Sequence, residues 1–298
     1  MNKGLSAWGI LITLSLIWGS SYLLIKLALF DGMGNIRLSP NQLGALRISI
    51  SALAMLAFIP YRSLKLKKKD LLVLLLAGVM GTGAPSFLFA YAEEHISSAL
   101  TGMLNATVPI WTVLSGIILY HSKINKRQLT GLVVGTVGIL ILSQVWKLEL
   151  IQLQAMPIIL VLIGTLCYAL NLNVIKFNLN HMDTRLITSV SIAMLLPFGL
   201  SYLIWDGFFI SVYQNPKVLE GVWPVLFLSL IGTAFALWLL NTLIKKTDPL
   251  FSSSVTYFIP VVAIILGFAY GETITYIEVT GMGIMLAGVF IMNRSTRK

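Results

Sequence analysis

Long apolar stretches alternate with short polar connections along almost the whole chain. Eight stretches contain no Asp, Glu, Lys, Arg or His and reach the length of about 20 residues that a helix needs to cross a bilayer. They are residues 4–25, 71–92, 96–120, 128–146, 150–175, 186–205, 221–244 and 249–271. Two more qualify when one charge is allowed inside, residues 38–61 with Arg47 and residues 273–293 with Glu278.

This pattern predicts an all-α membrane protein with ten transmembrane helices. Barrel strands would alternate apolar and polar residues at every second position, and these stretches are continuously apolar. The composition agrees, because only 11% of the 298 residues are charged, against about 25% in soluble domains. Cys167 is the one cysteine, which excludes a disulfide framework and a cysteine-based metal site. We expect no metal and no cofactor.

The positive charges predict how the chain is threaded. With ten spans, 16 Lys and Arg residues fall in connections on one side and only Arg37, Lys147 and Lys217 fall on the other. Cytoplasmic loops carry the excess of Lys and Arg, so both termini are predicted to be cytoplasmic. The net charge of +10 therefore reports orientation beside membrane lipids, and we expect no nucleic-acid partner. Lys26 and Arg47 are the two cations left inside spans.

A shift of 150 or 151 residues aligns sparse positions of the two halves. Residues 18–26 overlay 168–176, and other matched residues keep their order: Gly81-Thr82 with Gly232-Thr233, Pro109 with Pro260, and Gly131 and Gly138 with Gly281 and Gly288. We infer a duplication, with repeats at residues 1–148 and 149–298. Five spans per repeat is an odd number, so the second repeat is inverted, an architecture used for alternating access.

The motifs resemble those of the EamA-type branch of the drug/metabolite transporter superfamily. The resemblance rests on Trp18-Gly19-Ser20-Ser21-Tyr22 followed by Lys26, Arg47 within Gly44-Ala45-Leu46-Arg47, Pro109, Pro260, and Gly271-Glu272-Thr273 before a Gly-rich last helix. The first repeat departs from the family with Tyr120-His121 in place of Gly-Glu. The resemblance implies transport of small organic metabolites, and from it we expect export of amino acids or related compounds from a bacterial inner membrane by alternating access.

Polar residues inside spans are the candidate pathway residues, because the membrane interior makes them costly. Trp18, Tyr22 and Lys26 recur every four residues and share one helix face. The alternative reading of Lys26 is a side chain that extends to the headgroups. Arg47 lies about 12 Å from the end of its span at 1.5 Å per residue, where it either contacts substrate or clamps helices.

Aromatic and amide side chains extend this set, with helix packing as the alternative for any one of them. The further candidates are Asn105, Trp111, Tyr168, Asn171, Lys176, Trp238, Asn241 and Tyr257. Pro109 and Pro260 are predicted to be hinges beside a central cavity, since proline removes a backbone donor and bends a helix. Glu93 lies at the predicted outer end of its span, where it is a loop residue, a gate or a proton-sensitive group.

These observations lead to a transporter whose partners are a small-molecule substrate and membrane lipids, as a monomer or weak homodimer. One alternative is uptake or exchange of a phosphorylated or nucleotide-linked solute, which requires several cations at one site. Another is a membrane-embedded enzyme, which requires an acid-base or nucleophile-base pair at one depth. We find no such pair and therefore predict no catalytic residue.

Overall fold

The protein is all helical in the part of the chain that its computed structural model describes. That part comprises residues 3–60, 66–142, 144, 148–247 and 249–293, with the backbone alone described at 3–6, 148–154, 249–250, 254, 257 and 292–293. Within these ranges the one β-type contact is an isolated bridge between Phe30 and Ile36. The all-α prediction is confirmed.

The helices before residue 143 form the first half of the fold. They are α1 (Lys3–Leu29), α2 (Pro40–Leu56), α3 (Lys68–Gly78), the π-helix η2 (Val79–Gly83), α4 (Ala84–Glu93), α5 (Ser98–Asn105), α6 (Val108–Tyr120) and α7 (Lys126–Leu142).

The helices after residue 147 form the second half. They are α8 (Leu148–Asn178), α9 (Thr184–Ala193), α10 (Leu196–Trp205), α11 (Phe208–Gln214), α12 (Pro216–Ser229), the π-helix η3 (Leu230–Phe235), α13 (Ala236–Lys246), α14 (Pro249–Ser253), the 3₁₀-helix η4 (Ser254–Tyr257), α15 (Ile259–Ala269) and α16 (Tyr276–Asn293).

Each apolar stretch found in the sequence contains helix in the described structure. The protein is a multi-pass membrane protein. Six described helical segments are long and apolar enough to cross a membrane by length and composition: Ala7–Leu29, Lys68–Glu93, Ser98–Tyr120, Ala155–Asn178, Thr184–Trp205 and Pro216–Lys246. The short helix α11 was not predicted, because it falls in a connection between two of the apolar stretches.

Pro109 and Pro260 lie where helices are interrupted. α5 ends at Asn105, and Pro109 lies in the first turn of α6. Pro260 lies in the first turn of α15, directly after η4. Proline has no backbone N–H and its ring clashes with the preceding turn, so it is accommodated at a helix start and breaks a continuous helix. The two prolines thus mark breaks in the two halves, while their role as hinges stays a prediction.

Two π-helical turns occur 151 residues apart. η2 contains Gly81-Thr82, and η3 contains Gly232-Thr233. A π turn accommodates one extra residue in an α-helix and is frequent at functional sites. These are the two Gly-Thr pairs that the sequence alignment of the halves matches.

Helices α1 and α8 each pack against the other half of the fold. α1 contacts α12, α13 and α15, and α8 contacts α3, α4 and α6. Gly19 of α1 leaves no room for a Cβ atom beside Val262, and a Cβ atom on Gly164 of α8 would lie 2.8 Å from the ring of Phe89. These close approaches interlock the two halves at the middle of the molecule.

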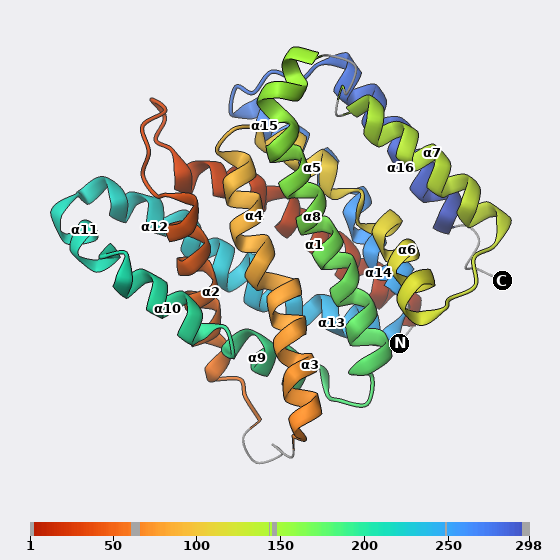
Figure 1. The fold of residues 1–298 in the computed structure, drawn as a ribbon, viewed down its shortest axis with the longest axis horizontal. Helices are drawn as coiled ribbons and strands as arrows, with labels where there is room; N and C mark the ends of the chain where they lie inside the picture. The colour runs from red at the N-terminus through yellow and green to blue at the C-terminus, as the bar shows by residue number, and fades with distance from the viewer. Residues whose placement is uncertain (1–2, 61–65, 143, 145–147, 248, 294–298) are drawn as a thin grey trace.

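A glycine seam joins α7 and α16, which run side by side along one edge of the molecule (Figure 1). A Cβ atom on Gly288 would collide with the backbone of Gly135 and lie 2.6 Å from the carbonyl oxygen of Gly131. In contrast, Gly283 of the same helix is exposed, and a Cβ atom there would meet nothing within 4 Å. Small residues in membrane helices allow this close approach.

We predict that Gly288→Ala lowers the thermal midpoint of the purified protein in detergent, because its methyl group pushes α7 and α16 apart. Gly283→Ala is the matched control, since alanine favours a helix over glycine by about 1 kcal/mol and meets no obstacle there. The control should melt at or above the wild-type temperature. Equal midpoints for the two variants would contradict the seam.

Candidate functional site

A cavity lies in the core between the two halves of the fold. It contains about 750 Å³ of space that no atom fills, including its mouth. Its described walls come from α1, α2, η2, α4, α5 and α6 of the first half and from α8, η3, α13, α14 and η4 of the second. Six of the candidate pathway residues lie on these walls: Trp18, Tyr22, Arg47, Asn105, Tyr168 and Asn171.

Arg47 is the one charged side chain among the described residues that line the cavity. It lies in the middle of α2 and is 7% exposed. Its Nε donates a hydrogen bond of 3.0 Å to the hydroxyl of Thr233, and its guanidinium also interacts with the hydroxyl of Tyr168. None of the ion pairs in the described chain includes Arg47. The cavity therefore carries a positive charge that no carboxylate of the described residues neutralises.

The two π-helical turns line this cavity, and η3 contacts α1 while η2 contacts α8. Trp18 donates from Nε1 to the carbonyl of Gly232 in η3 at 2.8 Å. A Cβ atom on Gly232 would lie 3.1 Å from the hydroxyl of Ser21, and one on Gly81 of η2 would lie 2.6 Å from Nδ2 of Asn171. Glycine in each π turn thus lets a polar residue of α1 or α8 approach the opposite backbone closely.

Aromatic rings form one wall of the cavity. The ring of Phe89 stacks on Tyr168 with centroids 5.6 Å apart and is tilted against Tyr22 at 6.0 Å. All three side chains line the cavity. Such rings offer a large apolar surface beside phenol hydroxyls, which suits an organic solute with both polar and apolar parts.

Hydroxyl groups complete the lining, and sequence reasoning did not select them. They are Ser21, Thr233, Ser252, Ser253 and Thr256. Serine and threonine are common in helices, where their hydroxyls bond the preceding turn, so composition does not distinguish them. Two of them had a signal in the sequence: Thr233 belongs to the Gly-Thr pair that recurs in both halves, and Ser21 belongs to the motif Trp18-Gly19-Ser20-Ser21-Tyr22.

Lys26 and Lys176 lie away from the described cavity walls and cap helix ends. The ammonium of Lys26 donates to the carbonyls of Glu93 and Ile96, at 2.7 and 3.3 Å, where α4 ends. The ammonium of Lys176 donates to the carbonyl of Thr247 at 2.6 Å, where α13 ends. Cations bind favourably to the carbonyls left free at helix C-termini. The two lysines make equivalent contacts in the two halves.

Four other candidate residues whose side chains are described lie outside the cavity lining. Trp238 is 43% exposed and packs beside Phe235, while Asn241 is buried and donates to the hydroxyl of Thr188 at 2.7 Å. Glu93 is fully buried, and neither it nor Trp111 is among the described lining residues. The side chain of Tyr257 lies outside the described residues.

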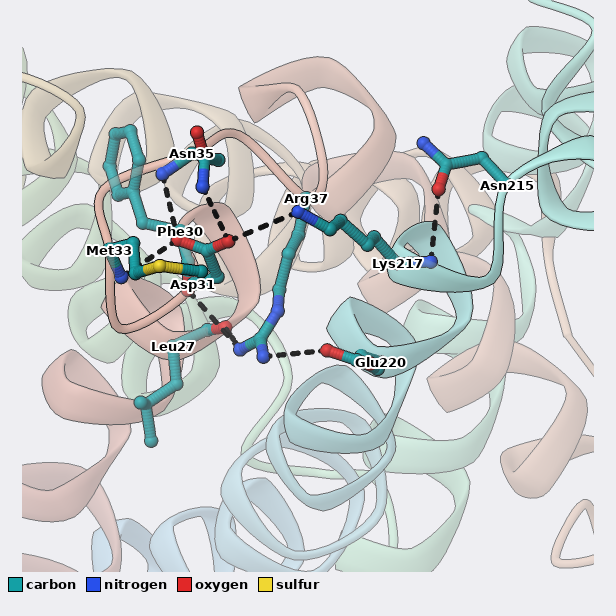
Figure 2. Close-up of polar contacts among 9 residues, drawn as sticks. All are labelled: Leu27, Phe30, Asp31, Met33, Asn35, Arg37, Asn215, Lys217 and Glu220. Carbon is teal, nitrogen blue, oxygen red and sulfur yellow. Dashed lines mark hydrogen bonds and ion pairs between the residues drawn. The ribbon is translucent and has the colours of Figure 1, made fainter.

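An ionic clamp connects the loop after α1 to the start of α12 (Figure 2). Arg37 pairs with Glu220 at 2.8 Å, and Lys217 pairs with Asp31 at 3.6 Å. Asp31 also accepts hydrogen bonds of 2.8 Å from the backbone and side-chain amides of Asn35. These bonds, with a smaller contribution from Lys217, lower the pKa of Asp31 to about 2. Asp31 therefore stays ionised at every physiological pH.

Comparison with known proteins identifies the architecture built around this cavity. Residues 6–144 and 155–294 match the model of the EamA-like transporter family. The chain belongs to the EamA-like transporter family. The resemblance inferred from the sequence motifs is confirmed.

Relatives of this EamA-like transporter extend along its whole length. It is 26% identical to the uncharacterized inner membrane transporter YedA of Escherichia coli strain K12, over 97% of this chain and 90% of that protein. It is 23% identical to a probable terminal-alkyne amino-acid exporter of Streptantibioticus cattleyicolor, over 99% of this chain and 96% of that protein. A solved crystal structure with 14% sequence identity matches it with a TM-score of 0.66, over 98% of this chain and 99% of that chain. The last likeness shows the fold.

We predict that Thr233→Val lowers the thermal midpoint of this EamA-like transporter, because it removes the hydroxyl that accepts from Arg47. An unpaired buried donor costs about 1–3 kcal/mol. Thr82→Val is the matched control, since the hydroxyl of Thr82 is buried without a hydrogen-bond partner in the described chain. The control should melt at or above the wild-type temperature. Equal melting temperatures for Thr233→Val and Thr82→Val would contradict a stabilising Arg47–Thr233 hydrogen bond.

Proposed function

We propose that this protein transports small organic metabolites across the inner membrane and that it exports amino acids or related compounds. The observation that carries the proposal is a cavity between the two halves with one cation, Arg47, on its described walls. Its lining combines this charge with aromatic rings, amides and hydroxyls. This combination suits a small solute with a carboxylate and an organic side chain.

The lining offers a partner for each part of an amino acid. The guanidinium of Arg47 pairs with a carboxylate through charge-assisted hydrogen bonds. The amide oxygens of Asn105 and Asn171 have no hydrogen-bond partner among the described residues and can accept from an ammonium group. The rings of Tyr22 and Tyr168 line the cavity and can stack against the side chain of the bound amino acid.

The same lining argues against the alternatives. A phosphorylated or nucleotide-linked solute calls for several converging cations, and the described walls supply one. A hydrolytic or transfer enzyme calls for a general base, and the described walls include no Asp, Glu, His, Cys or Lys. A zwitterion or small anion fits better than either.

Alternating access by two inverted five-helix repeats is the mechanism that we propose. Three observations support it: the family match over residues 6–144 and 155–294, the π turns 151 residues apart, and the exchange of α1 and α8 between the halves. Inverted repeats bind substrate at their interface and rock around it. Ten transmembrane helices with cytoplasmic termini complete the proposal, and the direction of export rests on the names of relatives.

The test is counterflow in liposomes, with purified protein and labelled amino acids, nucleosides and sugar phosphates. We expect amino acids to exchange and the corresponding amino acid amides not to compete, because an amide lacks the carboxylate that Arg47 binds. Arg47→Gln should weaken the apparent affinity by about tenfold or more through loss of a charge-assisted contact. Arg47→Lys should lie between Gln and wild type, since lysine keeps the charge without the planar fork.

Arg127→Ala is the control, because Arg127 is exposed at the start of α7, away from the cavity. It should transport like wild type, and all variants should elute as monodisperse protein before reconstitution. Exchange of sugar phosphates in preference to amino acids, or normal affinity in Arg47→Gln, would overturn the proposal.

A further inference from the structure

Glu93 ends α4 with a side chain that is 0% exposed. Both of its carboxylate oxygens are buried, and neither has a hydrogen-bond partner in the part of the chain that the structure describes. A buried polar group without a partner is rare in proteins and calls for a physical explanation.

Charged and titratable groups lie around Glu93, but none of the hydrogen bonds that they make in the described chain is to its carboxyl group. From α1, Lys26 binds the backbone carbonyls of Glu93 and Ile96. Tyr22 of the same helix interacts electrostatically with the Glu93 carboxyl group. From α2, Arg47 binds Thr233. α8 contributes Tyr168, which stacks on Phe89 one turn from Glu93, and α5 contributes no titratable side chain.

Glu272 approaches from the segment after α15, and its carboxylate is held at the start of α5. Its two oxygens accept from the backbone N–H groups of Ser98 and Ala99 at 2.9 and 3.0 Å. Gly271 has a φ of 89°, a left-handed conformation that ends the helix and that glycine adopts without strain. Glu272 thus lies at the N-terminus of α5, from which a carboxylate repels a second negative charge on Glu93.

The fold does not need an acid at this position. The residue 151 positions later, in the last turn of α13, is Ile244, which is also fully buried. Lys176 makes the equivalent capping contact beside it, to the carbonyl of Thr247. An apolar side chain therefore fills the corresponding space in the second half. Neither packing nor helix capping therefore explains why a carboxyl group lies at position 93.

Burial decides which form of the carboxyl group this arrangement accommodates. Burying an ionised carboxylate without a hydrogen-bonded partner costs far more than burying its neutral acid. Lys26, whose charge would offset that cost, already donates to backbone carbonyls. The closed packing around Glu93 is therefore compatible with the acid and not with the anion.

We propose that Glu93 is a proton-binding site at the predicted outer end of the pathway and that its proton controls opening of that end. When α1, α4 and the segment at Glu272 separate, water reaches Glu93, and the acid releases its proton to become a carboxylate beside Lys26. When the carboxylate takes a proton from the outer solution, the end closes again. The proposal deepens the proposed function, because the solute leaves through this end.

Infrared spectroscopy tests the protonation directly and needs no substrate. We expect the C=O stretch of a buried carboxylic acid in wild-type protein at about pH 8, well above the usual glutamate pKa of about 4.3. Glu93→Gln should lose this band, and Glu94→Gln should keep it, since Glu94 is the adjacent half-buried acid at the same helix end. A band of equal size in wild type and Glu93→Gln would overturn the proposal.

Transport from liposomes tests the control of opening. With the inner pH fixed, lowering the outer pH from about 8 to about 6 should lower the wild-type rate several-fold, because a proton on Glu93 closes the outer end and protonation of one group shifts up to about tenfold per pH unit. Glu93→Gln mimics the protonated acid and should give a flat profile. Glu94→Gln and His95→Asn should keep the wild-type profile, and Asp31, with a pKa of about 2, does not titrate in this range.

If Glu93→Gln misfolds, Glu93→Asp replaces it, and a displaced pH midpoint supports the proposal. A pH profile of Glu93→Gln that equals that of wild type contradicts it. Should no amino acid move at any pH, the proposed function fails, while the infrared band still decides whether Glu93 binds a proton.

Discussion

The burial of one cation, Arg47, is the constraint on which the centre of this molecule depends. A buried charge is costly unless polar groups interact with it, and Thr233 and Tyr168 on the opposite half of the fold interact with Arg47. Thr233 belongs to the π turn η3, whose neighbouring carbonyl at Gly232 accepts from Trp18. The cation, the π turn and the packing of α1 against the second half are therefore parts of one polar arrangement, and the cavity lies where they meet.

The sequence predicts the helices well because a bilayer requires long apolar stretches, and those stretches are visible one by one. It also selects Arg47, Tyr22 and Asn171, since polar residues are conspicuous within such stretches. The π turns were not predicted, because they depend on packing between segments rather than on local composition, and α11 was not predicted because it falls in a connection between two apolar stretches. For Lys26 the sequence predicts the helix face but not the contact. Its spacing places it on the same face of α1 as Trp18 and Tyr22, but its ammonium binds the backbone at the end of α4, which local sequence does not reveal.

The two halves share a framework but differ in their charges. Lys26 and Lys176 cap equivalent helix ends, and both π turns carry the Gly-Thr pair. In contrast, the buried ionisable residues Arg47 and Glu93 belong to the first half, and Ile244 stands at the place that corresponds to Glu93. In the mechanism that we propose, the shared framework supplies two similar surfaces that move against each other, while Arg47 binds the solute and the carboxyl group of Glu93 binds a proton.

The central claim is that Arg47 holds the carboxylate of a solute between the two halves. A structure determined with a bound amino acid tests it most directly. We predict density for the ligand in the central cavity, with its carboxylate within hydrogen-bond distance of the Arg47 guanidinium and its ammonium facing Asn105 or Asn171. A ligand that binds outside this cavity, or binds in it with its carboxylate turned away from Arg47, would contradict the account.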